Sequence, residues 1–283
     1  KNYSASRILI GLSKKSAGIE LIIEVLNMAM KYHVTDIVVP IAIELQKHYS
    51  LIEYDSRKYK RYTQILNDWS EDLRAEILAQ NYYTLIVAKL KGNRNPETLA
   101  QEAQPLIEEL EAIRPSVQTY RFHFMFYLLK VYRYQLVNDH LKITESCIEA
   151  LDYFNNIDVT IPYLPRFVFF SRQITPLIHL GEFDMAKKIL FECLALPNKG
   201  SFNWNLMLQY LVFLGFHSNR PELSFSAYQK VKKTAWKFKS ERFSEQWRIY
   251  KAYIVLFKKH GLLENSEELR LYKFLNEVPI QSK

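Results

Sequence analysis

The chain has 283 residues, a formal net charge of +8 and a hydrophobic content of 48%. This hydrophobic content excludes an intrinsically disordered chain, and the presence of only 7 Gly and 10 Pro argues against an all-β or low-complexity protein. The longest uninterrupted apolar run, residues 37–43, is short and contains Pro40, so we expect no membrane-spanning helix.

The positive charge is concentrated at the C-terminal end. Residues 201–283 carry 14 Lys and Arg against 7 Asp and Glu. A basic region of this kind can attract nucleic acid, an anionic membrane or an acidic protein, or it can be a solvated face that maintains solubility.

Apolar residues recur at helical spacing along nearly the whole chain, which predicts an all-α protein with about 12 to 14 helices. In the first part of the chain the predicted helices cover 16–32, 37–51, 55–69, 71–91 and 96–113. The pattern leaves open whether 55–69 and 71–91 are two helices or one long rod. The later predicted helices cover 117–136, 139–154, 165–179, 182–195, 203–216, 221–233, 241–260 and 264–275.

The later helices pair into hairpins around recognisable turns. Asn138, Gly181 and Asn219 are the predicted turn centres, spaced by 43 and 38 residues. Such spacing is typical of stacked helical repeats. Cys147 and Cys193 each occupy an apolar position inside a predicted helix, so we expect buried packing residues rather than a disulfide, in a reducing, cytoplasmic setting.

The hairpins resemble tetratricopeptide repeats, the helix-turn-helix units of about 34 residues. The second hairpin carries the resemblance best, with Gly181 at the turn, Phe183 as the aromatic residue and Ala186 where the helices cross. Its later positions are Leu190, Leu194 and Pro197. The first hairpin matches through Asn138, His140, Ala150 and Leu151. The third keeps Tyr228 but has Ser224 at the small-residue position. The periods exceed 34 residues, Ile143 replaces a small residue, and the family's tryptophan-to-tyrosine pattern is largely missing.

The resemblance implies a right-handed α-solenoid of stacked antiparallel helix pairs. We expect one continuous array, with highly degenerate pairs over 1–115 and tetratricopeptide-like repeats over 116–283. The alternative is an unrelated helical bundle or solenoid.

Residue patterns for catalysis or metal binding are scarce in the sequence. The seven histidines lie far apart, and none has another His or Cys three or four residues away. We interpret Glu108, Glu109 and Glu111 as part of the solvent-exposed face of an amphipathic helix. We therefore expect no enzyme activity, no cofactor and no metal site.

The predicted function is a protein-interaction scaffold that holds a peptide or partner protein in the concave groove of the array. The expected groove residues are His123, Tyr127, Lys130, Arg166, Gln173, Asn205, Gln209, Glu245 and Arg248. The alternative is a nucleic-acid-binding array that uses Lys230, Lys232, Lys233, Trp236, Lys237 and Lys239. Because the helix over 264–275 is apolar, we also expect either that the native chain continues beyond Lys283 or that this end self-associates.

Overall fold

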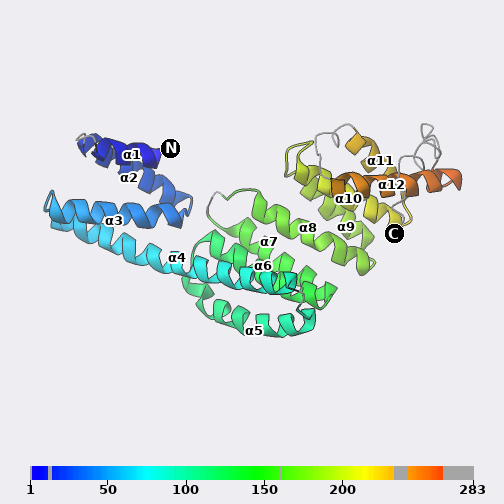
Figure 1. Ribbon diagram of the computed structural model, residues 1–283, viewed down its shortest axis with the longest axis horizontal. Coiled ribbons are helices and arrows are strands. Elements are labelled where there is room, and N and C mark those ends of the chain that lie inside the picture. The colour runs from blue at the N-terminus through cyan, green and yellow to red at the C-terminus, as the bar shows by residue number, and fades with distance from the viewer. Residues whose placement is uncertain (1, 12–14, 93, 160, 233–240, 264–283) are drawn as a thin grey trace. The chain divides into compact units, whose positions relative to one another are not determined.

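The computed structural model describes residues 2–11, 15–92, 94–159, 161–232 and 241–263. These residues contain helices and no β-strand, which confirms the all-α class. The helices, shown in Figure 1, are α1 (Asn2–Gly11), α2 (Lys15–Lys31), α3 (Thr35–Leu51), α4 (Ser56–Lys91), α5 (Pro96–Ile113), the 3-10 helix η1 (Arg114–Ser116), α6 (Tyr120–Leu136), α7 (His140–Asn156), α8 (Leu164–His179), α9 (Phe183–Leu194), α10 (Phe202–His217), α11 (Pro221–Lys232) and α12 (Glu241–Lys259).

The chain divides into two compact units. Unit 1 comprises Lys1–Asp139 and Asp152–Pro162, and unit 2 comprises His140–Leu151 and Tyr163–Lys283. Helix α7 contributes to both. The helix predicted over 264–275 lies outside the described residues, and the expectation of one continuous array stays a prediction.

The three predicted turn centres are confirmed by their backbone conformation. Asn138, Gly181 and Asn219 have φ of 54°, 80° and 54°, in the left-handed region that Gly and Asn tolerate best. In each turn the N–H of the next residue donates to the carbonyl oxygen five residues earlier: Asp139 to Tyr134, Glu182 to Leu177 and Arg220 to Gly215, at 3.1, 2.9 and 3.0 Å. This bond ends one helix and reverses the chain into the next.

The same closure occurs at two further turns. His33, with φ of 50°, precedes a bond from the Val34 N–H to the Ala29 carbonyl oxygen at 2.8 Å. Gly261, with φ of 72°, precedes a bond from the Leu262 N–H to the Phe257 carbonyl oxygen at 3.0 Å. One turn geometry therefore recurs in both units.

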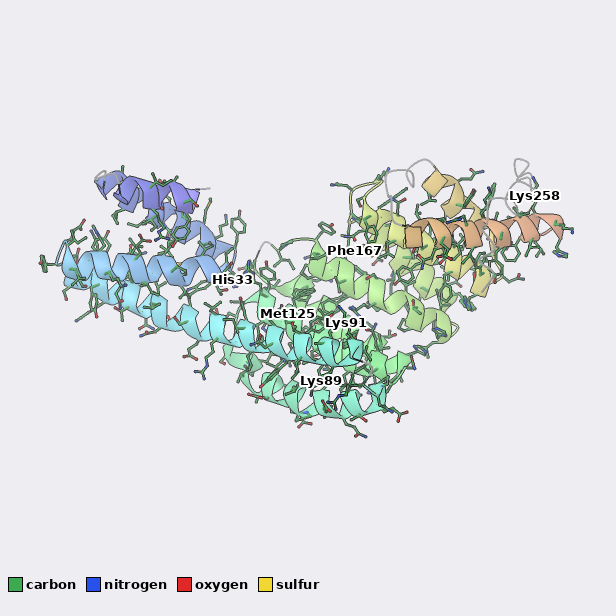
Figure 2. All side chains as sticks on the ribbon, viewed as in Figure 1. His33, Lys89, Lys91, Met125, Phe167 and Lys258 are labelled. Atoms are coloured by element: carbon green, nitrogen blue, oxygen red, sulfur yellow. The ribbon has the colours of Figure 1, made fainter. Side chains whose placement is uncertain are left out.

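The centre of unit 1 is the single 36-residue helix α4. Residues 55–91 contain neither Gly nor Pro, so nothing in the sequence breaks the helix near Ser70. Asp55 caps its start by accepting the N–H groups of Arg57 and Lys58, both at 3.0 Å. Near its far end, Lys89 pairs with Glu102 of α5. Figure 2 labels Lys89 on α4.

The two halves of α4 pack against different helices. The first half joins a core of α2 and α3 side chains that includes Ile22, Leu26, Ile41 and Leu45, with Tyr62 of α4 itself. The second half contacts α5 and α6. This long shared helix places the ends of α2 and α5, and the start of α6, along its middle.

Unit 2 contains the hairpins α8–α9 and α10–α11. Ala186, expected where the helices cross, is fully buried, as is Ser224 at the matching position of α11. Gly215 of α10 faces Ser224 so closely that an added Cβ would lie 2.2 Å from the Ser224 Oγ. Small residues on both helices thus allow the close crossing at this hairpin.

Both cysteines are fully buried free thiols, which confirms the packing role. The Cys193 Sγ donates to the Phe167 carbonyl oxygen at 3.7 Å. Burial raises the pKa of each thiol to about 12, so both remain protonated at neutral pH.

Candidate functional site

The predicted groove residues are distributed over both units. His123, Tyr127 and Lys130 lie on α6 in unit 1, and Arg166, Gln173, Asn205, Gln209, Glu245 and Arg248 lie in unit 2. Five are buried, namely His123, Tyr127, Gln173, Asn205 and Gln209. Lys130, Arg166 and Arg248 are half-buried, and Glu245 is exposed. A partner would reach the buried five only if the helices separated, so their binding role stays a prediction.

Several of the buried polar groups are bound within their own segment of chain. The Gln173 side chain donates to the Phe169 carbonyl oxygen at 3.3 Å, and the Asn205 side chain donates to the Ser201 carbonyl oxygen at 2.8 Å. His123 lies 3.0 Å from the Val117 carbonyl oxygen. These bonds explain how polar residues are accommodated in the interior.

Most residues of the alternative nucleic-acid site lie outside the part of the chain that the structure describes. Lys230 is exposed on α11, and Lys232 is the last residue of that helix. Lys233, Trp236, Lys237 and Lys239 lie outside the described residues. This alternative therefore stays a prediction.

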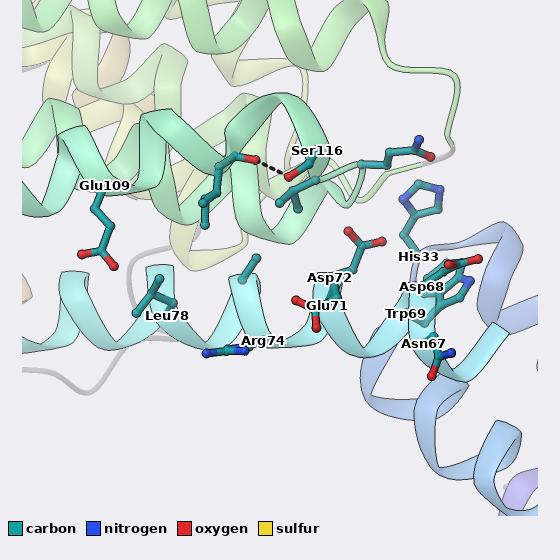
Figure 3. A pocket seen from close by; sticks show the side chains of 14 residues that line it. His33, Asn67, Asp68, Trp69, Glu71, Asp72, Arg74, Leu78, Glu109 and Ser116 are labelled. Atoms are coloured by element: carbon teal, nitrogen blue, oxygen red, sulfur yellow. Dashed lines mark hydrogen bonds between the residues drawn. The ribbon is translucent and has the colours of Figure 1, made fainter. Parts of the chain in front are cut away.

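A cleft of about 880 Å³ lies in unit 1, beside the middle of α4 (Figure 3). Its lining comes from the α2–α3 turn, from α4, from the end of α5 and from the segment that leads into α6. We call it the acidic cleft, and its lining residues are His33, Asn67, Asp68, Trp69, Glu71, Asp72, Arg74, Ala75, Leu78, Glu109, Ile113, Ser116, Val117 and Gln118.

Carboxylates dominate the charge of the acidic cleft. Asp68, Glu71, Asp72 and Glu109 line it, against the single guanidinium of Arg74. Asp68 and Asp72 are four residues apart, which places them on the same face of α4. The Glu109 carboxylate accepts a hydrogen bond from the Tyr82 hydroxyl at 2.6 Å.

An aromatic pair lies at the α2–α3 end of the cleft. The rings of His33 and Trp69 meet edge to face, with centroids 5.7 Å apart. The positive φ of His33 belongs to the turn that ends α2, so the closure of that turn also positions the imidazole at the cleft. Figure 3 shows His33, Asp68 and Trp69 grouped at this end.

Burial shifts the titration of two cleft groups toward their neutral forms. It raises the pKa of Asp72, and nearby Asp68 adds to the rise, while the Gln118 backbone and His33 oppose it. Burial also lowers the pKa of His33, against the attraction of Asp72 and a hydrogen bond with the Gln118 backbone. Both shifts disfavour an ion pair between these two residues.

Glu76 continues the row of carboxylates from the cleft into the interior. It is 8% exposed, and its Oε2 accepts a hydrogen bond from the Thr35 hydroxyl at 2.6 Å. Burial raises the pKa of Glu76, while the side chains of Thr35 and Thr119 oppose the rise. An Arg121–Asp36 ion pair of 2.8 Å also joins α6 to α3, so polar contacts brace the elements around the cleft.

The side chains that line the acidic cleft offer few candidates for a nucleophile or for a metal site. Ser116 donates its hydroxyl to the Ile113 carbonyl oxygen at 2.7 Å, and no cysteine lines the cleft. Within the described ranges, no group of three or more His, Cys, Asp and Glu residues is arranged to hold a metal ion. None of the described helices combines the length and the apolar character needed to cross a membrane.

The chain matches no protein-family model, no curated protein and no solved structure.

The acidic cleft was not predicted from the sequence. The spacing of Asp68, Asp72 and Glu76 was an available signal, because it places three carboxylates on one helical face that also carries buried residues. His33 and Gln118 are far from α4 in sequence, and no local pattern indicates that they reach it.

Proposed function

We propose that the protein is a non-enzymatic interaction scaffold of tetratricopeptide-like helix pairs, and that unit 1 binds a Lys- or Arg-containing segment of a partner protein. The observation that carries this proposal is the acidic cleft, where four carboxylates and a tryptophan side chain line one hollow.

The charge of the cleft selects the class of partner. Four carboxylates against one guanidinium attract a cationic group and repel the phosphates of a nucleic acid. Asp68 and Glu71 are exposed, so an incoming ammonium or guanidinium reaches them without opening the fold. Charge-assisted hydrogen bonds to these carboxylates are stronger than bonds between neutral groups.

Trp69 adds a second mode of cation recognition. Its ring is half-buried and lines the same cleft as the carboxylates. A Lys or Arg head group over an aromatic ring gains about 0.5–1 kcal/mol at an exposed site. The combination favours a cationic side chain over a metal ion or an anionic metabolite.

The volume of the cleft supports a peptide segment as the ligand. About 880 Å³ lies within the range of about 300–1,000 Å³ typical of binding pockets. A cleft of this size accepts a few side chains of a partner. Leu78 and Ile113 add apolar lining for the aliphatic stem of a Lys or Arg.

The stacked-pair architecture is part of the proposal. The recurring turn closure and the small residues Ala186, Gly215 and Ser224 at helix crossings support it. We extend the proposal to a right-handed solenoid, and to a cytoplasmic setting on the basis of the two buried free thiols.

Selection from a random peptide display library tests the binding function. The wild-type chain is expected to enrich peptides that share Lys or Arg residues. Asp68→Asn/Glu71→Gln is expected to lose this enrichment, whereas Glu108→Gln/Glu111→Gln, which removes two exposed carboxylates outside the cleft lining, is expected to keep it. Enrichment of acidic or purely apolar peptides, or equal behaviour of the two variants, would contradict the proposal.

A further inference from the structure

The turn between α3 and α4 exposes three large apolar side chains. Leu51, Ile52 and Tyr54 are 68%, 54% and 80% exposed, and we call them the apolar tip. The turn lies at the left of Figure 1, where the α3–α4 hairpin reverses. Three such neighbours on one turn form a patch, unlike the single exposed apolar residues that are common on protein surfaces.

The apolar tip is held by hydrogen bonds on both sides. The N–H groups of Ile52 and Glu53 donate to the His48 carbonyl oxygen at 2.9 and 3.2 Å, and the Asp55 N–H donates to the Tyr49 carbonyl oxygen at 2.9 Å. The Glu53 carboxylate lies 2.9 Å from the His48 Nε2. The backbone therefore fixes the outward position of the three side chains.

Exposed basic residues flank the apolar tip in sequence, on both α3 and α4. The exposed basic residues closest in sequence are Lys47, Arg57, Lys58, Lys60 and Arg61. With a rise of about 1.5 Å per residue, all of them lie within about 9 Å of the turn along the helix axes. Glu53 and Asp55 are the carboxylates between Lys47 and Arg61, and both lie within 4 Å of the Lys58 Nζ, at 3.8 and 3.7 Å.

We propose that the apolar tip docks on the surface of a bilayer that contains anionic lipids. Leu51, Ile52 and Tyr54 enter the boundary between head groups and acyl chains, and the cations behind them meet the lipid phosphates. The cations are set back from the turn by at most about 9 Å, within the depth of about 5–10 Å to which interfacial apolar residues are buried. This surface is distinct from the acidic cleft, whose charge is opposite, and the inference does not depend on the proposed peptide binding.

Charge and shape together favour a lipid surface over other partners. The α3–α4 turn exposes apolar side chains beyond the basic residues of the two helices, and this arrangement suits a flat, anionic surface with an apolar interior. A nucleic acid would engage the cations but would leave the aliphatic groups of Leu51 and Ile52 without an apolar environment. An anionic bilayer satisfies both features.

Vesicle co-sedimentation of the whole chain tests the proposal. The wild type is expected to bind vesicles of phosphatidylcholine with phosphatidylserine, to bind phosphatidylcholine alone much more weakly, and to dissociate at high salt. Leu51→Ser/Ile52→Ser/Tyr54→Asn is expected to weaken binding about tenfold or more. Asn is used at position 54 because it tolerates the φ of 56° found there.

The contribution of the basic residues to vesicle binding is tested with Arg57→Glu/Lys60→Glu. Because a cation near an anionic membrane contributes about fivefold in affinity, this variant is expected to bind at least about 25-fold more weakly. The matched control is Lys188→Glu/Lys199→Glu, which changes net charge equally at exposed positions of unit 2 and is expected to bind as the wild type does. Circular dichroism and gel filtration establish that each variant is folded.

Depth of insertion is measured with an environment-sensitive dye. Cys147 and Cys193 are fully buried, so a thiol-reactive dye labels an introduced Ile52→Cys selectively, and Glu192→Cys in unit 2 is the control. The fluorescence of the dye at position 52 is expected to shift to the blue with anionic vesicles, and that of the dye at position 192 is not.

Failure of the wild type to bind anionic vesicles would overturn the proposal. So would binding that is lost with the cations but unchanged in the apolar variant, which would indicate a purely electrostatic contact such as that with nucleic acid.

Discussion

Acidification tests the interior position of His123. This side chain is 6% exposed, its ring stacks on Tyr153 with centroids 4.0 Å apart, and its Nε2 lies 3.0 Å from the Val117 carbonyl oxygen, to which it donates a hydrogen bond. Burial lowers the pKa of His123 to about 4; the Val117 hydrogen bond opposes this effect and nearby Arg114 adds to it. The neutral imidazole is therefore the folded form at physiological pH.

The magnitude follows from the difference between 6.5 in the unfolded chain and about 4 in the folded chain. A tenfold change in proton affinity corresponds to about 1.4 kcal/mol. The free energy of unfolding that is lost on acidification therefore reaches a limit of about 3.4 kcal/mol once the pH is below 4. The unfolded state binds the proton more tightly, so the stabilisation is complete above pH 6.5 and is lost as the pH falls. At about pH 5 the loss is about 2 kcal/mol.

Two measurements follow for His123. In an NMR titration, the His123 Cε1–H signal, assigned from its absence in His123→Phe, is expected to stay unchanged until the pH approaches 4. In urea unfolding, the wild type is expected to lose about 2 kcal/mol more than His123→Phe between about pH 7.5 and about pH 5. A titration midpoint near 6.5 would refute the buried, neutral imidazole.

Three further predictions concern stability, each measured by urea unfolding. Burial raises the pKa of Glu76 above 4.5, so its contribution to stability is complete below pH 4.5 and is lost as the pH rises through its folded pKa; Glu76→Gln is expected to flatten this decline, and an unchanged profile would exclude Glu76 as its source. Gly215→Ala places a Cβ 2.2 Å from the Ser224 Oγ and 2.9 Å from backbone atoms, and is expected to cost about 1–3 kcal/mol; a neutral effect would contradict the close crossing. Gly181→Ala must hold φ of 80° and is expected to cost about 1 kcal/mol, whereas Gly92→Ala, with φ of −81°, is expected to cost much less; equal effects would contradict the left-handed turn.

Local sequence signals predicted most of the helices and their turns. Gly181, Asn138 and Asn219 were identified as turn centres between the predicted helices, and all three occupy the left-handed region that Gly and Asn tolerate. Pro96 and Ile113 bound α5 as predicted, since proline punctuates helices at fixed places. His33 was not identified as a turn residue, although it occupies the same left-handed region with φ of 50°.

The local sequence patterns did not predict how the helices pack against one another or which polar residues are buried. The sequence left open whether α4 continues across Ser70; in the structure it is one helix whose two halves pack against different neighbours. His123, Gln173 and Asn205 were expected on an accessible face because they are polar, yet each is buried with a hydrogen bond to a backbone carbonyl nearby in the chain. Polarity alone does not distinguish a solvated position from a satisfied interior one.

The central claim is that the acidic cleft binds a cationic peptide segment. The most direct measurement is NMR of the tryptophan side-chain indole signals, with that of Trp69 assigned by Trp69→Phe, during titration with a Lys- or Arg-containing peptide taken from the display selection. The predicted result is a saturable shift of the Trp69 signal, with those of Trp204 and Trp247 unchanged, and loss of that shift in Asp68→Asn/Glu71→Gln. Saturable peptide binding that leaves the Trp69 signal unmoved would place the site elsewhere and contradict the proposal.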